Sequence, residues 1–266
     1  MAEKDNRARL SIYSLDYFKV FRAQTCINSA KWQRKKVALL FKYLLIAEAP
    51  VPRHVLINEF WPRVEFKKQR ARHNLAVTLY DLRRTLCPCH PSTSAPSYIL
   101  STNDYLELNW NTIDFYDVKE FKRYYSQGQE AMAQQQWEQA ETTFTAANKL
   151  HQTDFLVADT GYSWITEERT RLQNMRLGLF EDLAMAQYKL GHYRQAQLQA
   201  ETLIQLNPCR EQGYRLLMRI FTALGRRVQA IEKYRECERM LKTEFGLKPD
   251  PKTTELYQSI MSGKSH

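Results

Sequence analysis

A repeated spacing of small and aromatic residues in the C-terminal half most constrains how this chain can fold. Gly191 and Gly225, Ala196 and Ala230, and Ala200 and Tyr234 are each 34 residues apart, and Pro208 follows the first set. This is the period of the helical hairpin called a tetratricopeptide repeat. One such hairpin cannot bury its apolar face alone, so neighbouring hairpins stack and share a core. The spacing therefore predicts a domain of stacked helical hairpins.

The helical character extends upstream of these hairpins. Trp137, Ala140, Phe144 and Ala147 repeat the second half of the pattern, and we expect an extra helix around Tyr162 to Leu172 to fill the interval before Ala196. From Ile113 onward no strand signal is evident, and the content of Ala, Gln, Leu and Glu is typical of packed helices. Residues 113–266 are therefore predicted to form an all-α tetratricopeptide-like domain.

The N-terminal half has a different order of elements. Alternating residues in Leu10 to Phe21 predict one or two short strands. Apolar residues at helical spacing then predict three helices, over residues 35–48, 53–61 and 65–86. Two strands, 98–102 and 105–110, flank Asn103 and Asp104, residues that tolerate positive φ in a hairpin turn. This order predicts a winged helix over residues 1–112, so the expected fold class is an α+β winged helix followed by the all-α domain.

The third predicted helix has two unlike faces. At 100° per residue its alanine and leucines form one apolar stripe: Ala71, Leu75, Leu79, Leu82 and Leu86. The opposite face carries basic, amide, aromatic and aliphatic side chains: Gln69, Arg70, His73, Asn74, Val77, Tyr80 and Arg84. A major groove is wide enough for a helix and offers guanine O6 and N7 to Arg, and adenine N6 and N7 to Asn or Gln. A solvated basic face is the alternative interpretation.

Charge is concentrated in the same half of the chain. The sequence has 39 Lys and Arg and 29 Asp and Glu, a formal net charge of +10. Residues 1–112 hold 18 basic and 9 acidic side chains, whereas residues 113–266 hold 21 and 20. A polyanion is therefore the expected partner of the first half, and the winged-helix order favours duplex DNA.

Several other classes of function have little support. Only 8 glycines are present, no Gly-rich phosphate loop is complete, and no catalytic motif is found, so neither an enzyme nor a cofactor is expected. Cys87, Cys89 and His90 lack a fourth ligand and the usual spacing, so no metal is expected. The cysteine pattern, the charged N-terminus and the short apolar runs predict a cytoplasmic protein without a membrane span.

With these motifs the chain resembles the Streptomyces antibiotic regulatory protein family of bacterial transcription activators. The resemblance lies in KKVALLFKYLL, HVLINEFW, ARHNLAVTLYDLRRTL, NDYLEL and IDFYDVKEF, and in DTGYSWITEERTRL, NPCREQGYRLLMRIFTALGRRVQAIEKYRE and LKTEFGLKPDP further on. It implies a winged helix of the response-regulator type over 1–112 and a bacterial transcriptional activation domain over 113–266. It also implies binding to direct repeats in promoter DNA and recruitment of RNA polymerase holoenzyme.

The expected DNA contacts follow from the faces of these elements. We expect five residues to face base edges: Gln69, Arg70, His73, Asn74 and Val77. Six are expected to contact phosphates: Arg34, Lys35, Lys36, Arg72, Arg83 and Arg84. The wing residues named for contact are Thr102, Asn103 and Tyr105.

Direct repeats would place a second copy head-to-tail on the DNA, because the half-sites point the same way. The alternative function is a tetratricopeptide scaffold or adaptor whose basic domain binds RNA or an acidic protein. Binding to random duplex, single-stranded RNA and the upstream promoter region would distinguish the two.

Overall fold

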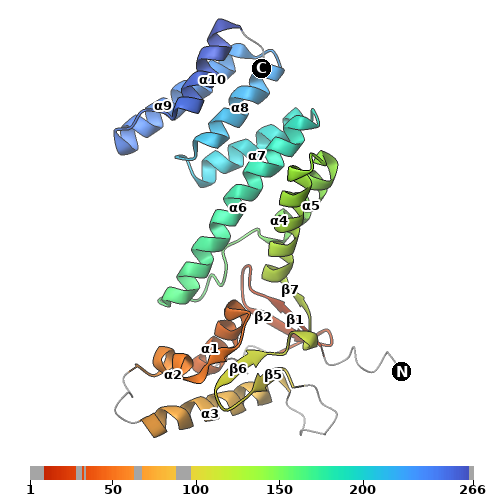
Figure 1. The fold of residues 1–266 in the computed structure, drawn as a ribbon, viewed down its shortest axis with the longest axis vertical. Helices are drawn as coiled ribbons and strands as arrows, with labels where there is room; N and C mark the ends of the chain where they lie inside the picture. The colour runs from red at the N-terminus through yellow and green to blue at the C-terminus, as the bar shows by residue number, and fades with distance from the viewer. Residues whose placement is uncertain (1–8, 28–31, 33, 63–67, 88–96, 264–266) are drawn as a thin grey trace, which may run out of the picture. The chain divides into compact units, whose positions relative to one another are not determined.

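The computed structural model describes residues 9–27, 32, 34–62, 68–87 and 97–263 (Figure 1). The chain divides into two compact units, which are treated separately below. Unit 1 comprises Met1–Val118 and Phe155–Glu168, and unit 2 comprises Lys119–Asp154 and Arg169–His266. None of the helices formed by the described residues combines the length and the apolar character that crossing a bilayer requires.

Unit 1 contains a sheet in the order β3-β2-β1-β7. Its strands are β1 (Leu10–Tyr13), β2 (Lys19–Arg22), β3 (Thr25–Cys26) and β7 (Ile113–Tyr116). β1 pairs antiparallel with β2 and parallel with β7. The expectation of strands in Leu10 to Phe21 is confirmed, but the expectation of no strand after Ile113 is wrong. β7 is only four residues long and its partner lies about a hundred residues earlier, so no local pattern announces it.

The rest of unit 1 confirms the predicted winged helix. The three helices are α1 (Lys35–Ala47), α2 (Arg53–Phe60) and α3 (Lys68–Leu86). A second sheet, in the order β4-β6-β5, contains β4 (Val51–Pro52), β5 (Ile99–Ser101) and β6 (Tyr105–Leu108). Strands β5 and β6 form the antiparallel hairpin, here called the wing. Residues 63–67, and with them the start of the predicted third helix, lie outside the described residues, as does most of the loop before the wing.

The apolar side of the three helices forms the core of this winged helix. In α1 the buried residues include Val37, Leu40, Phe41, Leu44 and Leu45, which recur at helical spacing. α1 and α2 both pack on α3. Each leucine fully buried in this way contributes about 1.5–3 kcal/mol to stability, so this core fixes which face of α3 is turned outward.

A later part of the chain also packs in unit 1. The N–H of Leu156 donates to the carbonyl of Ser14 over 2.8 Å, and that of Val157 donates to Asp16 over 3.2 Å. The side chains of Phe155 and Leu156 are buried. The ammonium group of Lys42 forms a 2.5 Å ion pair with Asp159. These contacts fix residues 155–159 beside β1 and α1.

Unit 2 consists of helices packed as hairpins, as the repeat predicts. Its elements are α4 (Asp117–Ala133), α5 (Trp137–Leu150), α6 (Ser163–Lys189), α7 (Tyr193–Leu206), α8 (Glu211–Ala223), α9 (Arg227–Phe245) and α10 (Pro251–Ser262); the first residues of α4 and α6 are part of unit 1. α7 and α9 pack on α8, and α10 packs on α8 and α9. The helix expected around Tyr162 to Leu172 is present, as the first part of α6, which continues unbroken to Lys189.

The same left-handed turn joins the two helices of each hairpin. Gly191 has a φ of 76° and Gly225 a φ of 69°, and the N–H groups after them return to carbonyls in the preceding helix turn. Gln135 occupies the corresponding place between α4 and α5 with a φ of 58°. Glycine adopts this conformation without strain and therefore marks such a turn in a sequence. Gln135 gives no such signal. This explains why only the second half of that repeat is evident in the sequence.

Candidate nucleic-acid interface

Helix α3 buries the predicted apolar stripe. Ala71, Leu75, Leu79, Leu82 and Leu86 are all buried. Thr78 and Thr85 are buried beside them, and their hydroxyls donate to the carbonyls of Asn74 and Asp81, one turn earlier, over 2.8 and 2.9 Å. Because these hydroxyls are satisfied within the helix, the buried side of α3 has the character of a core.

The opposite side of α3 is open. Of the five residues expected to face bases, Gln69, Arg70, His73 and Val77 are exposed and Asn74 is half-buried. These five are here called the α3 outer face. Val77 keeps 43% of its surface exposed and Tyr80 keeps 60%. Exposed apolar side chains gathered on one face are typical of a surface that contacts a partner. The guanidinium of Arg84 lies 5.8 Å from the centre of the Tyr80 ring.

Charge along α3 is almost entirely positive. Its one carboxylate is Asp81, and Arg34, just before α1, forms an ion pair with it. The exposed cations that border the α3 outer face are Arg72, Arg83 and Arg84. The single negative charge of α3, the Asp81 carboxylate, is therefore paired with a cation within unit 1.

Two further residues expected to contact phosphates, Lys35 and Lys36, make different contacts within the protein. The ammonium group of Lys36 donates to the carbonyl of Phe60 over 2.8 Å and lies 4.6 Å from the centre of the Trp61 ring. Burial lowers the pKa of Lys36. Lys35 is exposed, with its ammonium 5.5 Å from the centre of the Tyr162 ring. Both lysines are exposed, but Lys36 also ties α1 to the end of α2.

Arg83 also has a role within the protein. One of its guanidinium nitrogens donates to the carbonyl of Ile99 in the wing over 3.2 Å. Burial lowers the pKa of Arg83, and the charge of Arg53 lowers it further. Arg83 therefore connects the end of α3 with the first strand of the wing.

The turn of the wing is held by a threonine side chain. The hydroxyl of Thr102 accepts from the N–H groups of Asp104 and Tyr105, over 3.3 and 3.0 Å. Asn103 and Asp104 are residues that tolerate positive φ, but neither is among the described residues with that conformation. The Thr102 hydroxyl replaces the backbone acceptor that a tighter turn would need. Asn103 and Tyr105 are exposed at the tip.

Sequence reasoning missed Arg53 and His54 at the start of α2. The guanidinium of Arg53 donates to the Thr102 carbonyl over 3.0 Å and to the Ser101 hydroxyl over 2.7 Å. Its backbone N–H donates to Asp104 over 2.8 Å. A cation in the first turn of a helix opposes the helix dipole. This unfavourable position of Arg53 was the feature of the sequence that could have indicated its role.

These residues line a groove between the wing and the helices. It has a volume of about 660 Å³ and is lined by Pro52, Arg53, His54, Ile57, Arg72, Leu75, Asn103, Asp104 and Tyr105. It brings Asn103 and Tyr105 of the wing together with Arg72, Arg53 and His54, whereas Thr102 is not among its lining residues. A strand of phosphates could lie along it, between the wing and the α3 outer face.

The residues considered and rejected for metal binding are only partly described. Cys87 is half-buried, while Cys89 and His90 lie outside the described residues.

Comparison with known proteins matches the C-terminal part of the chain to a family and nearly the whole chain to one solved fold. A family model for the bacterial transcriptional activator domain matches residues 116–261. The regulatory protein AfsR of Streptomyces griseus is 33% identical over 94 residues, which are 35% of this chain and 10% of AfsR. The solved structure of Mycobacterium tuberculosis EmbR with a low-affinity phosphopeptide is similar with a TM-score of 0.82 at 21% identity.

The EmbR likeness covers 97% of this chain and 66% of the EmbR chain. It confirms the fold class, a winged helix followed by helical repeats. The chain spans only part of the length of either relative.

Proposed function

The chain belongs to the bacterial transcriptional activator domain family, as a transcription activator of the Streptomyces antibiotic regulatory protein type, and from this premise we propose that it binds promoter DNA sequence-specifically through the α3 outer face. This is a family of regulators rather than of enzymes. The observation that carries the proposal is the exposed side of α3, where Arg, His, amide and valine side chains stand opposite a fully buried leucine stripe.

In this proposal α3 lies in the major groove. Arg70 can offer two parallel N–H donors to a guanine, and Gln69 and Asn74 can pair with an adenine edge. The exposed Val77 suits the methyl group of a thymine. His73 lies between them and can donate or accept according to its tautomer. These side chains would supply specificity, since phosphate contacts carry no base information.

The basic residues around this face would supply the affinity for the DNA backbone. Arg72, Arg84 and Lys35 are exposed and suited to phosphates. Arg34, Lys36 and Arg83 hold elements of unit 1 together through the contacts described above, and each retains N–H donors for a phosphate. Thr102, Asn103 and Tyr105 would place the wing against the backbone, with Arg53 and His54 beside it.

The neighbouring residues Arg83 and Arg84 give a matched test of these roles. Arg83→Ala is expected to lower the free energy of unfolding of unit 1 by about 1–2 kcal/mol, because it removes a charged hydrogen bond to the wing. Arg84→Ala should change stability by less than about 0.5 kcal/mol. It should reduce the slope of log affinity against log salt by about 1, since one phosphate contact is lost. Equal effects of the two variants on stability would contradict this division.

Arg70→Ala tests the base contact. Binding to the preferred duplex, found by footprinting on genomic fragments, is expected to weaken by about 1–3 kcal/mol, with little change on random duplex. Titrations of both duplexes at one salt concentration measure the difference. An equal loss on both would make Arg70 a backbone contact. Stronger binding of the wild-type protein to single-stranded RNA than to either duplex would favour the adaptor function instead.

We further propose that two copies bind direct repeats head-to-tail and that the C-terminal part recruits RNA polymerase holoenzyme. Residues 113–266 carry a net charge of only +1, compared with +9 for residues 1–112. This supports residues 1–112 as the main DNA-binding domain and 113–266 as the domain for protein contacts. Footprints on one and two repeats, with particle masses on each, test the arrangement. A palindromic footprint from a two-fold dimer would contradict it.

A further inference from the structure

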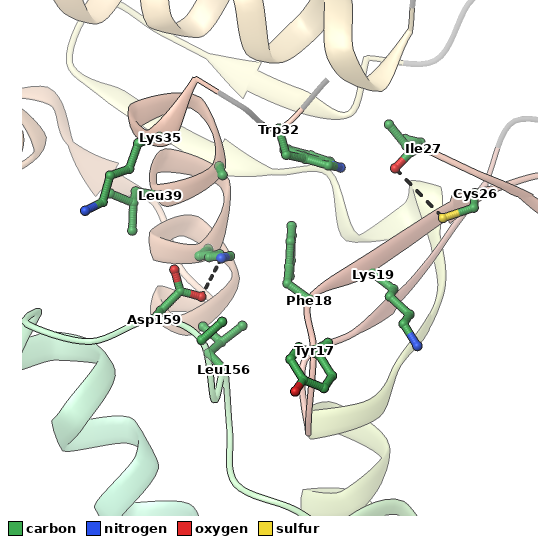
Figure 2. A pocket seen from close by; sticks show the side chains of 13 residues that line it. Tyr17, Phe18, Lys19, Cys26, Ile27, Trp32, Lys35, Leu39, Leu156 and Asp159 are labelled. Carbon is green, nitrogen blue, oxygen red and sulfur yellow. Dashed lines mark hydrogen bonds and ion pairs between the residues drawn. The ribbon is translucent and has the colours of Figure 1, made fainter. Parts of the chain in front are cut away.

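Figure 2 shows a second cavity in unit 1, which is lined by no residue of the α3 outer face. Its volume is about 900 Å³. The described residues that line it come from β2 and the two residues before it, from the end of β3 and Ile27, from Trp32 and α1, and from the segment Leu156–Asp159. Pockets that bind small molecules have volumes of about 300–1,000 Å³, so its size suits an organic ligand rather than a single ion.

The inner wall of this cavity is mainly aromatic and aliphatic. Phe18 and Trp32 meet edge to face with ring centres 5.4 Å apart, and Trp32 stacks on Phe41 at 5.6 Å. Ile27, Leu39 and Leu156 supply further apolar surface. Flat aromatic walls of this kind favour a planar apolar ligand.

The cavity lining contains more positive than negative side chains. Lys42 is buried, and its ammonium is compensated by the 2.5 Å ion pair with Asp159 and lies 4.6 Å from the centre of the Phe18 ring. Lys19 and Lys35 are exposed at the rim. Three ammonium groups and one carboxylate leave the described lining with an excess of positive charge. A ligand held here would therefore be favoured by an anionic group directed at the rim.

We propose that this cavity binds a planar apolar organic anion, of the class of an aromatic carboxylate or sulfonate. The ligand would lie against Phe18 and Trp32 with its anionic group toward Lys19. Because the segment Leu156–Asp159 forms one wall, the bound ligand would bridge that segment to α1. Lys35, which lines the cavity, is also a proposed phosphate contact, but none of the residues of the α3 outer face lines the cavity.

The fluorescent anion 1-anilinonaphthalene-8-sulfonate is a suitable probe of the full-length protein. We expect one site per chain. Ala158→Trp fills the cavity from an exposed position and should weaken binding by at least about tenfold, whereas the control Ala49→Trp, at an exposed alanine outside the lining, should not. Lys19→Gln should weaken the sulfonate about two- to fivefold and leave the neutral N-phenyl-1-naphthylamine unaffected.

Two cysteines provide an independent readout in the wild-type chain. Cys26 lines the cavity and is exposed, and Cys209 is exposed in unit 2. The probe should slow alkylation of Cys26 by N-ethylmaleimide, measured by mass spectrometry, without slowing that of Cys209. The proposal is overturned if the probe does not bind, if Ala158→Trp binds it as tightly as the wild type, or if both cysteines are protected alike.

Discussion

Replacing Asp117 by alanine is expected to lower the free energy of unfolding of unit 1 by about 3–5 kcal/mol. The Asp117 carboxylate is buried and accepts from the N–H groups of Ser14, Leu15 and Val118 over 2.6, 2.8 and 2.8 Å. It also accepts from the Ser14 hydroxyl over 3.1 Å. Alanine would leave these donors buried without an acceptor, and each such loss costs about 1–3 kcal/mol before the structure relaxes.

The matched control is Asp114→Ala, three residues earlier. Asp114 is exposed and forms a 2.8 Å ion pair with the exposed Arg9, so its loss should cost less than about 1 kcal/mol. Hydrogen exchange of the Ser14 and Leu15 amides, together with urea unfolding of each variant, measures the two effects. If both variants lose the same stability, Asp117 does not have this structural role.

The position of Asp117 also affects how a DNA-binding fragment should be made. A chain cut after residue 112 would lack β7 and Asp117, which together hold β1 and the turn after it. It would also lack Phe155 and Leu156, which are buried in unit 1. Loss of DNA binding by such a fragment would therefore report unfolding, and full-length variants are the better test of the interface.

Acid is expected to destabilise unit 2 through His151. The imidazole is fully buried, neither ring nitrogen has a hydrogen-bond partner among the described residues, and the ring centre lies 4.9 Å from that of Phe121. Burial, with a smaller contribution from the charge of Arg176, lowers the pKa of His151 to about 4 from an ordinary value of 6.5. The unfolded chain thus takes up a proton between pH 6.5 and 4 that the folded chain excludes.

The sign of the effect follows from this difference. The free energy of unfolding of unit 2 contains a contribution from the neutral His151 that is fully present above pH 6.5. This contribution is lost as the pH falls toward 4, by about 3 kcal/mol in total. His151→Phe should remove this part of the pH dependence. His192→Phe is the control, because that ring is exposed beside Glu141, at 3.1 Å. Urea unfolding at pH 7 and pH 4.5 measures the change, and an unaltered pH dependence in His151→Phe would refute the assignment.

Local patterns in the sequence were sufficient for much of the fold. The leucine stripe of α3 and the apolar positions of α1 repeat at helical spacing, and both are buried where that spacing predicts. Pairing between distant segments has no such signature. β7 joins β1 across most of unit 1, and β2 turns into β3 through Ala23 and Gln24, whose φ values of 44° and 68° are not announced by glycine or asparagine.

The candidate interface was predictable to the same extent. Helical periodicity identified the exposed side of α3, because it depends on one element alone. The contacts of Lys36 with Phe60, of Arg83 with Ile99 and of Arg53 with the wing depend on how separate elements pack. The spacing of charges therefore suggested where cations lie but could not distinguish those that hold the fold from those left for a ligand.

The central claim is that the α3 outer face contacts double-stranded DNA, and photochemical crosslinking tests it most directly. Val77 and Val157 are exposed to nearly the same extent, 43% and 42%. Each would be replaced by photoreactive benzoylphenylalanine in the full-length protein and irradiated with the footprinted duplex. The account predicts crosslinking of the duplex by the Val77→benzoylphenylalanine variant and none above background by the Val157→benzoylphenylalanine variant. Retained DNA binding with no crosslink at 77, or equal crosslinking at both positions, would contradict it.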